Sequence, residues 1–402
     1  MTAPPLTLRD LGEFGTIARI REWLDSSAGG LADASVRVGP GDDVAVTRPP
    51  EGQELLLTCD VQIVGRHFVP AWMTAEEIGR RALEVNLSDI AAKGGEVLWV
   101  LVSLGLAPEF RIDQLEQIYR GILSGLGSGS VVGGNLTSCH RDHWFLDITV
   151  VGATPIGRAA VRSGAQVGDL VFVTGSPGSA AAGLEILRAL ERSSTPSSAP
   201  PSAPSSARKE DRNVSDRGKI GSRMDIRDEA SRLGDPFAGW VNSFLCPRAR
   251  LGLGRALVSG GHVHAMLDVS DGILGDLFHL CESSRVSTVV ELEALAFATH
   301  DSAVLQRLGV PPGDAPWRWI LGPSDDYELL FTAHRSERQA ILALGDAHNV
   351  IVREIGEVRS GEPSIELRGG KTGIHDHLWT PDLPADSPSG GWDHFGPSDT
   401  TP

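Results

Sequence analysis

Five short polar clusters, each beside an apolar stretch, constrain the fold of this sequence more than any other feature. They lie far apart in the chain and comprise Gly41-Asp42-Asp43, Asp60, Asn86-Leu87-Ser88-Asp89, Gly133-Gly134-Asn135 and Asp268-Val269-Ser270-Asp271. A fold that brings these side chains together builds the oxygen-rich site that Mg²⁺ shares with substrate phosphates. Glycine beside the carboxylates lets the backbone approach phosphates closely. The clusters therefore predict ATP chemistry at a site with several magnesium ions.

The composition permits this chemistry and excludes several other classes of protein. A chain of 402 residues with 41% hydrophobic residues is long enough for two domains with real cores. A formal charge of −16 argues against a nucleic-acid partner and against an anionic membrane surface. The apolar run at 97–107 is too short to cross a bilayer. We therefore expect no nucleic acid and no membrane as partners.

The cysteines and the start of the chain indicate a cytoplasmic protein. The four cysteines form no C-x-x-C pair and are too few for a disulfide scaffold. The first residues contain no basic segment followed by an apolar one, so no secretory signal is expected. Both observations favour a reducing compartment.

Hydrophobic periodicity predicts mixed α/β structure. Strands are expected at 54–58, 97–106 and 144–151, and Thr74-x-x-Glu77 is a capping box that opens a helix closed by Gly94-Gly95. From residue 160 onward strands and helices alternate, with strands at 170–174, 263–268, 288–292, 327–331 and 350–358. The segment 193–234 begins with a run of Ser, Thr, Pro and Ala only, and its composition predicts a disordered insertion.

Asp89 is the acidic residue with the clearest structural demand. It shares one face of the predicted helix with Ile78, Ala82 and Val85. A buried carboxylate needs a cation or backbone amides as partners. An N-cap or an internal ion pair is the ordinary explanation for a single Asp, but Asn86, Ser88 and the other clusters favour a metal.

Two strand ends carry turns that resemble phosphate-binding loops. Residues 173–178 and 268–272 each lead into a predicted helix, whose N-terminus favours an anion. Each is also an ordinary helix cap, and neither matches the Walker or the dinucleotide-binding pattern.

The histidines leave a metal hydrolase open as a rival. Cys139, His140 and His143, or His262 and His264, offer zinc-type donors, although their spacing fits no closed site. A polar hairpin loop at 139–143, between the Gly-Gly-Asn turn and a strand, is the favoured interpretation.

Taken in order, the motifs resemble one enzyme family. They are Gly12-Glu13-Phe14, Gly41-Asp42-Asp43, Asp60 with Gly65-x-His67-Phe68, residues 85–89, Gly133-Gly134-Asn135, Arg162-Ser163-Gly164, residues 268–272, Asp326-Tyr327-Glu328 and Asp393-His394-Phe395. This series resembles the thiamine-monophosphate kinases, within the superfamily of aminoimidazole ribonucleotide synthetase-like proteins. The resemblance implies a two-domain α/β (α+β) fold, a homodimer formed largely by the N-terminal halves, and transfer of a phosphoryl group from ATP to thiamine monophosphate with Mg²⁺.

The resemblance also implies boundaries and site residues. It places an N-terminal domain at 1–155, a C-terminal domain at 156–395 that contains the insertion, and a tail at 396–402. The implied site residues are a magnesium shell of Asp43, Thr58, Asp60, Asp89, Asn135, Asp268 and Asp271, ATP contacts at Tyr119, Gly134, Asn135, Arg162 and Ser270, and substrate contacts at His67, Asp325 and Trp392. No protein nucleophile is required, because phosphoryl transfer depends on positioning and charge stabilisation.

This chain departs from the family pattern at Cys59, at Asn135 and at Pro323-Ser324. A thiol is a poor ligand for Mg²⁺, and an amide at 135 removes one negative charge. Two alternatives therefore stay open: another ATP-dependent synthetase of the same superfamily, and a diverged nucleotide-binding dimer with weak catalysis.

Overall fold

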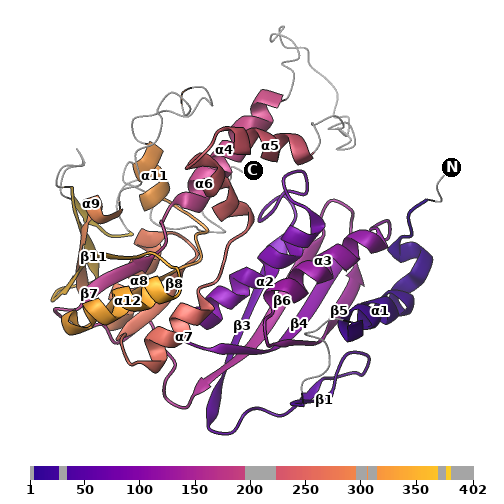
Figure 1. Ribbon diagram of the computed structural model, residues 1–402, viewed down its shortest axis with the longest axis horizontal. Helices are drawn as coiled ribbons and strands as arrows, with labels where there is room; N and C mark the ends of the chain where they lie inside the picture. Colours follow the sequence, from indigo (N-terminus) through magenta and orange to yellow (C-terminus); the bar gives the residue numbers. More distant parts are fainter. Residues whose placement is uncertain are drawn as a thin grey trace.

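The chain folds around two β-sheets, one in each half. The computed structural model describes residues 4–26, 34–194, 223–295, 306, 315–369 and 377–381. The sheet of the N-terminal half has four strands and that of the C-terminal half has seven. The two halves lie side by side, with helices α2 and α7 close to their junction (Figure 1). The two-domain mixed α/β architecture expected from the sequence is therefore present.

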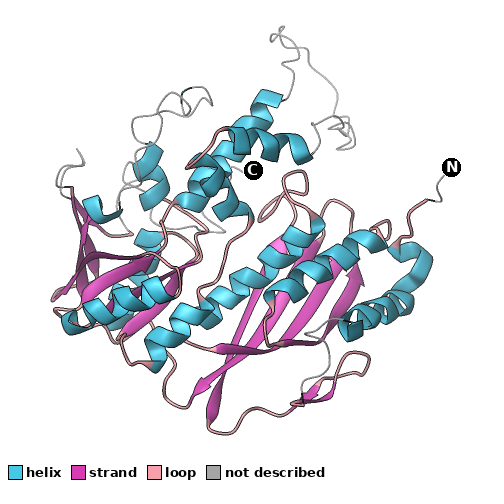
Figure 2. Cartoon of the chain, viewed as in Figure 1, coloured by secondary structure: helices cyan, strands magenta, loops and turns pink. Residues whose placement is uncertain are grey.

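The N-terminal sheet has the order β3-β6-β4-β5 and carries helices on one face. Its strands are β3 (Gln53–Ile63), β4 (Glu96–Leu106), β5 (Ser130–Ser138) and β6 (Phe145–Pro155). Strands β4 and β5 are parallel, joined through α3 (Ile112–Gly125), and the other pairs are antiparallel. Helices α2 (Ala75–Ala92) and α3 pack against each other on the same side of this sheet (Figures 1 and 2).

Helix α2 begins and ends where local sequence signals predict. The Thr74 side chain accepts from the amide of Glu77, the Glu77 side chain accepts from the amide of Thr74, and both halves of the capping box are present. The chain leaves the helix at Lys93, and Gly94 has a left-handed φ of 70°. Ile78, Ala82 and Val85 are buried, so the predicted apolar stripe is the face that packs inward.

Two predictions for this half are wrong. Gly133-Gly134-Asn135 lies inside strand β5 and is not a turn. A Cβ at Gly134 would sit 1.9 Å from the carbonyl oxygen of Val102 on β4, so close packing between strands explains the glycine. The polar hairpin loop expected at 139–143 is also wrong: residues 139–144 form a loop, but β4 lies between β5 and β6 in the sheet, so the loop joins two strands that do not pair. The remaining N-terminal elements are α1 (Leu8–Ser26), β1 (Val36–Val38) and β2 (Val46–Thr47).

The C-terminal sheet has the order β13-β12-β9-β11-β7-β10-β8 and is mostly antiparallel. Only β12 and β9 pair in parallel among its described strands. The strands are β7 (Leu170–Thr174), β8 (Ala265–Val269), β9 (Ser287–Glu291), β10 (Glu328–Ala333), β11 (Val352–Arg359), β12 (Ser364–Arg368) and β13 (His377–Trp379). The helices are α4 (Ser179–Ser194), α5 (Arg223–Arg232), α6 (Phe237–Leu245), α7 (Leu251–Ser259), α8 (Ile273–Ser284), α9 (Leu292–Leu295), α11 (Ala315–Leu321) and α12 (Arg338–Ala347), with a short 3₁₀ turn, η2 (Arg335–Glu337).

The predicted disordered insertion at 193–234 is wrong at both ends. Helix α4 continues to Ser194, and α5 occupies 223–232. Ile226 and Ala230 on α5 are buried and belong to the same hydrophobic cluster as α4 and α6. Two apolar residues four positions apart in a charged segment are a weak signal, so composition concealed this helix. Residues 195–222 lie outside the described residues.

Two deletions separate these two parts of the insertion. Replacing residues 195–222 by a short Gly/Ser linker is expected to leave the free energy of unfolding nearly unchanged, because a sequence of mostly Ser, Pro, Ala and charged residues has little apolar surface to bury. Extending the deletion to residue 232 is expected to cost about 2–3 kcal/mol, since the buried Ile226 is lost. Urea denaturation of both variants measures the difference. Equal stability of the two would contradict the packing of α5.

Candidate active site

Helix α2 forms the boundary between the two domains and donates contacts to the C-terminal half. The hydroxyl of Ser88 donates to Oδ2 of Asp268 at 2.6 Å. The Glu84 carboxylate accepts from the backbone amide of Ala249 at 2.8 Å. Glu84 and Ser88 are both buried, so water does not compete for these two hydrogen bonds. The bonds therefore fix the relative position of the domains at this point.

Four of the predicted metal ligands converge at this junction. Asp89 on α2 accepts a hydrogen bond from Oγ1 of Thr58 on β3 at 2.5 Å. Two residues further along β3, the amide of Asp60 donates to Oδ1 of Asn86 at 3.0 Å. Asp268 is the penultimate residue of β8 and contacts α2 through Ser88. Residues from three separate segments, β3, α2 and β8, thus meet, which brings together three of the five predicted clusters.

The carboxylates of this junction repel one another, which shows that they are close. Burial, followed by the charges of Asp89, Asp147 and Asp271, raises the pKa of Asp60 to about 6. Burial and the charge of Asp89 raise the pKa of Asp268 to about 7. A cation relieves both the burial penalty and the repulsion. We call Asp60, Asp89, Asp268 and Asp271 the acidic cluster.

The donor set of the acidic cluster fits Mg²⁺, but it does not form a closed cage. Carboxylates and a threonine hydroxyl are hard oxygen ligands. Among the described residues, however, no three His, Cys, Asp or Glu side chains lie close enough together to hold a metal ion by themselves. This arrangement suits an ion that keeps water and substrate phosphate oxygens in its shell, as Mg²⁺ does in phosphoryl-transfer sites.

Two cations flank the acidic cluster. Lys93 follows α2, and its Nζ donates to the carbonyl oxygen of Met266 at 3.5 Å. Burial and then the charge of Arg162 lower the pKa of Lys93, whereas Asp268 and Asp89 act in the opposite direction. Arg162, a predicted ATP contact, is therefore near the acidic cluster, with an exposed side chain that a phosphate can reach. Sequence analysis missed Lys93.

The phosphate-like turn at 268–272 donates two of its amides to a carboxylate of the protein. The amides of Ser270 and Asp271 donate to Oδ2 of Asp276 at 3.1 Å each. Burial, followed by the charge of Asp268, raises the pKa of Asp276 to about 8. The expectation of an anion on these amides is wrong here, because a carboxylate of the protein already occupies them. Asp276 instead fixes the loop that presents Asp271.

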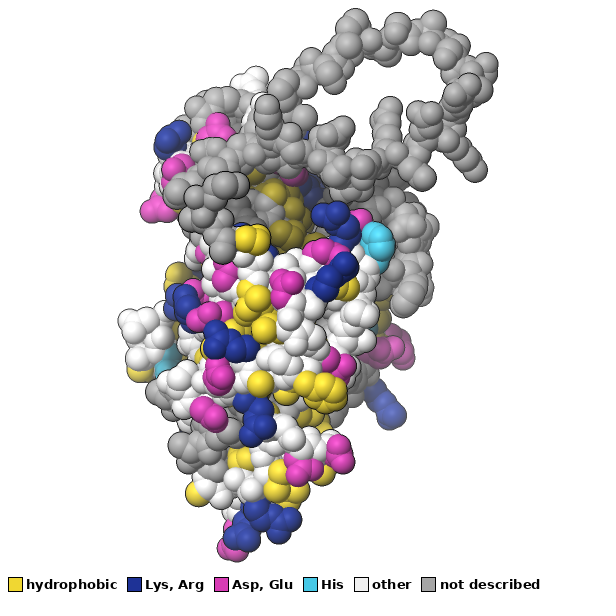
Figure 3. Space-filling model, turned by 90° about the vertical axis from the view of Figure 1, so that its right-hand side faces the viewer, with side chains coloured by type: hydrophobic (Ala, Val, Ile, Leu, Met, Phe, Trp, Pro, Cys, Tyr) yellow, Lys and Arg dark blue, Asp and Glu magenta, His cyan; other side chains and the backbone are white. Residues whose placement is uncertain are grey.

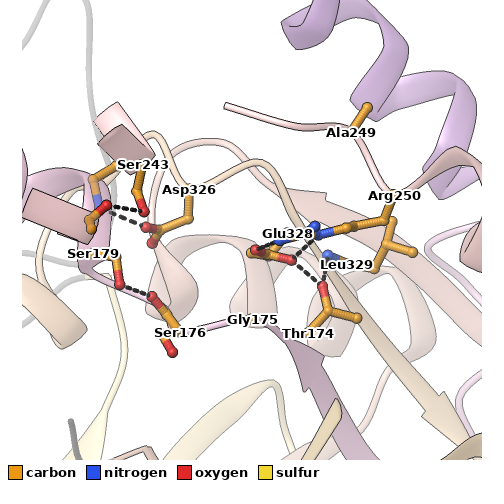
Figure 4. Close-up of polar contacts among 12 residues, drawn as sticks. Thr174, Gly175, Ser176, Ser179, Ser243, Ala249, Arg250, Asp326, Glu328 and Leu329 are labelled. Atoms are coloured by element: carbon orange, nitrogen blue, oxygen red, sulfur yellow. Dashed lines mark hydrogen bonds and ion pairs between the residues drawn. The ribbon is translucent and has the colours of Figure 1, made fainter. Parts of the chain in front are cut away.

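In the other phosphate-like turn, at 173–178, backbone amides are also hydrogen-bonded to a carboxylate of the protein. At the start of α4, the amides of Gly178 and Ala180 donate to the Asp326 carboxylate at 2.6 and 3.0 Å. Nearby, Arg250 makes a two-pronged ion pair with Glu328, which also accepts from the hydroxyl of Thr174 (Figure 4). A cavity of about 410 Å³ lies beside these residues, and none of the predicted metal ligands lines it.

Several predicted site residues lie away from the acidic cluster within one chain. Asn135 is on edge strand β5, and Asp60 is on β3 at the opposite edge of the same sheet. Asn135 pairs with Ser103 and shares the face that carries Leu101, which is not the face covered by α2. Gly134 is on the same edge strand.

Two further residues are also separated from the cluster. Asp43 is in the exposed loop between β1 and β2, two residues after Gly41, whose backbone lies against the guanidinium of Arg21 on α1. Tyr119 is buried on α3, 6.1 Å from the ring of Trp23, and burial raises the pKa of its hydroxyl. Direct contact of these residues with ATP or metal stays a prediction.

The predicted substrate contacts come from both domains. Nδ1 of His67 accepts from the amide of Ile63 at 3.0 Å at the end of β3. Asp325 precedes β10 and forms an ion pair at 2.8 Å with Arg81 of α2, a residue that sequence analysis missed although it lies on the buried stripe of α2. Trp392 lies outside the described residues.

The zinc alternative finds no support in the geometry. His262 pairs with Glu337 at 2.8 Å, and His264 pairs with Asp169 at 2.8 Å. His140 is exposed and approaches Asp142 at 3.6 Å. All four cysteines are free thiols. These histidines make ordinary side-chain pairs and do not converge on a metal.

Matches to known families agree with this architecture. Residues 41–154 match AIR synthase related protein, N-terminal domain, and residues 166–367 match AIR synthase related protein, C-terminal domain. The fold and the interdomain acidic cluster thus belong to a two-domain protein of the AIR synthase-related class.

Comparison with individual proteins shows which family of this class the chain resembles. Thiamine-monophosphate kinase of Escherichia coli O157:H7 is 31% identical over 386 residues, which cover 92% of this chain and 99% of that protein. The thiamine-monophosphate kinase structure from Stenotrophomonas maltophilia K279a superimposes with a TM-score of 0.67 at 28% identity, covering 89% of this chain and 97% of that one. A structure described as AaThiL complexed with AMPPCP and TMP gives a TM-score of 0.59 at 25% identity, covering 94% and 100%. The chain belongs to the thiamine-monophosphate kinase family, and the resemblance inferred from its motifs is confirmed.

No helix in the described part of the chain is both long and apolar enough to cross a bilayer. Seen from the side of the N-terminal domain, acidic and basic side chains alternate with small hydrophobic groups (Figure 3).

Proposed function

We propose that this protein transfers the γ-phosphoryl group of ATP to thiamine monophosphate, giving ADP and thiamine diphosphate. The observation that carries the proposal is the acidic cluster at the domain junction, in a chain that belongs to this kinase family. A phosphate oxygen of thiamine monophosphate attacks the γ-phosphorus, and the bond between that phosphorus and the β-phosphate oxygen breaks. One negative charge develops on the β-phosphate oxygen of the departing ADP, and the site must stabilise that charge.

The residues of the acidic cluster have the chemistry to hold magnesium. Asp60, Asp89, Asp268 and Asp271, with the hydroxyl of Thr58, would bind it. When bound, Mg²⁺ screens the phosphate groups from each other and neutralises the charge that develops on the oxygens. The role of the protein is to bring carboxylates from two domains to one place, with Arg162 available for a phosphate and Ser270 adjacent to the cluster.

Release of ADP, measured in a coupled assay, tests the proposed activity. We expect turnover with thiamine monophosphate and Mg²⁺, and none with thiamine, which lacks the attacking phosphate. Turnover only with formylglycinamidine ribonucleotide would favour a synthetase of the same superfamily. ATP binding without turnover on either compound would favour a diverged nucleotide-binding protein.

We also propose that the protein is a homodimer that uses the open face of the N-terminal sheet. This face, opposite α2 and α3, carries exposed apolar side chains at Leu55, Leu57, Val61 and Leu101. Leu57 is 71% exposed, which is unusual for the middle of an apolar strand. Asn135 is on the same face, so the proposed interface would cover it.

Leu57→Glu is expected to weaken this dimer by on the order of 100-fold, because each interface would bury two uncompensated carboxylates. Light scattering after size-exclusion chromatography, run over a concentration series, measures the effect. Ile351→Glu is the matched control, since Ile351 is 58% exposed in the C-terminal half. A monomeric wild type, or equal weakening by both variants, would contradict the proposed interface.

A further inference from the structure

Arg81 is a fully buried cation at the domain junction. Only 1% of its side chain is exposed, although it carries a permanent charge. Its Nε donates to Oε1 of Gln62 at 3.3 Å, Nη1 donates to the carbonyl oxygen of Phe244, and Nη2 donates to Oδ2 of Asp325 at 2.8 Å. Burial of a guanidinium is tolerated only when its donors are satisfied. Here the partners come from three segments in both domains.

Aromatic rings complete the surroundings of Arg81. The guanidinium carbon is 4.9 Å from the ring centroid of Phe244 and 6.0 Å from that of Tyr327. Tyr327 has a left-handed φ of 52°, which non-glycine residues seldom adopt, and its amide donates to the carbonyl oxygen of Val269 at 2.8 Å. The loop that carries Asp325 is therefore held from two sides, by α2 and by the end of β8.

The same guanidinium connects the two described residues predicted to contact the substrate. Gln62 is buried on β3, and the next residue, Ile63, donates its amide to Nδ1 of His67 at 3.0 Å. A continuous path thus runs from His67 through β3 to Arg81 and on to Asp325. Arg81 sets the position of the Asp325 carboxylate relative to the segment that carries His67.

The contact with Asp325 engages one carboxylate oxygen. Nη2 of Arg81 reaches Oδ2, and no described residue donates a hydrogen bond to Oδ1. The Asp325 side chain is 40% exposed, in contrast to Arg81. The aspartate therefore has a fixed orientation and a remaining acceptor that a ligand can reach. A cationic heteroaromatic ring with an amino group matches a carboxylate of this kind.

We propose that Arg81 is a positioning residue for the substrate side of the site. It acts through Asp325 by fixing its carboxylate for the thiazolium and aminopyrimidine part of thiamine monophosphate. This inference rests on the proposed function and on Asp325 as a substrate contact. Lysine cannot replace arginine here, because one ammonium group cannot reproduce three differently directed donors and a planar stacking surface.

Arg81→Lys tests the proposal, because its effect on KM should differ between thiamine monophosphate and ATP. We expect KM for thiamine monophosphate to rise about 10- to 100-fold, as for the loss of a charged hydrogen bond, with KM for ATP and the magnesium midpoint changed by less than about 2-fold. Arg80→Lys is the matched control. Arg80 is the neighbouring residue on α2, pairs with Glu84 at 2.6 Å and is 32% exposed. It should leave KM for thiamine monophosphate unchanged.

A double-mutant cycle with Asp325→Asn tests whether Arg81 acts through Asp325. In the Asp325→Asn background, Arg81→Lys should have little further effect on KM for thiamine monophosphate. Additive effects, or equal losses for ATP and thiamine monophosphate, would show that Arg81 only stabilises the domain junction, and the proposal would be wrong. If Arg81→Lys is too unstable to assay, Asp325→Asn alone must reproduce the selective rise in KM, and an unchanged KM there overturns the proposal.

Measurements on the wild-type protein show whether a negative result concerns this inference or the proposed function. Isothermal titration with thiamine monophosphate is run beside the kinetic assay. A wild type that neither binds nor phosphorylates thiamine monophosphate overturns both proposals. A wild type that does both, combined with an unchanged KM in Arg81→Lys, overturns only the role of Arg81.

Discussion

Asp89→Asn is expected to lower kcat by on the order of 10³-fold while the protein stays folded, because the substitution removes one charge from the acidic cluster. The amide oxygen of Asn can still accept the hydrogen bond from Thr58, so the local packing is preserved. Asp89 raises the pKa of both Asp60 and Asp268 by repulsion. Its neutralisation should therefore leave the metal-free protein as stable as the wild type, or more so, at pH 7–8.

Magnesium dependence distinguishes this effect from general damage. Thermal unfolding with a non-hydrolysable ATP analogue should show stabilisation by added Mg²⁺ in the wild type and little in Asp89→Asn. Asp113→Asn is the control, because Asp113 is an exposed residue on α3 that pairs with nearby Arg111, away from the acidic cluster. The metal role of Asp89 is wrong if turnover is unchanged, or if ATP affinity falls equally with and without Mg²⁺.

Arg250→Met is expected to reduce the free energy of unfolding by about 3 kcal/mol, since it leaves the charge of Glu328 without its partner in a site with little solvent. The two side chains are 25% and 10% exposed, and Arg250 donates from Nε at 2.8 Å and from Nη2 at 2.5 Å. Glu328 also accepts from Thr174 at 2.5 Å, so one lost cation disturbs the junction of β7 and β10. Urea denaturation measures the loss.

Two further variants test whether the charge is responsible. Arg111→Met removes one partner of an exposed pair and should leave the free energy of unfolding nearly unchanged. The double variant Arg250→Met, Glu328→Gln should be more stable than Arg250→Met alone, because the uncompensated carboxylate is gone. If the second substitution instead adds to the loss, packing of the arginine stem and not charge explains its contribution.

Local signals allowed much of the fold to be predicted. The capping box at Thr74 and Glu77 and the glycine after α2 specify both ends of a helix from a few neighbouring residues. The alternating strands and helices from β7 to β11 also follow their hydrophobic pattern. Predictions failed where the cause is distant in sequence. From the sequence alone, Gly134 indicates a turn. In the structure β4 lies beside it, and the carbonyl of Val102 leaves no room for a side chain.

The candidate site, too, could be predicted only in part from the sequence. Asp60, Asp89, Asp268 and Asp271 could be selected from the sequence, because a carboxylate beside an apolar strand or on an apolar helix stripe requires a partner. Their mutual approach could not be derived, since it depends on β3, α2 and β8 meeting at a domain junction. The amides of Ser270 and Asp271 illustrate the difference. They look free for a phosphate, yet the carboxylate of Asp276 accepts from both.

Three properties could be read from the residues alone: hard oxygen donors in five clusters, an excess of acidic side chains and helices with defined ends. Those properties belong to single residues and short windows, so they survive without knowledge of the fold. Folding in three dimensions sets which donors share a site. It places Asn135 on the opposite edge of the sheet from Asp60 and joins Asp325 to β3 through Arg81. Charge repulsion and desolvation depend on distances between residues far apart in the chain, and only folding sets those distances.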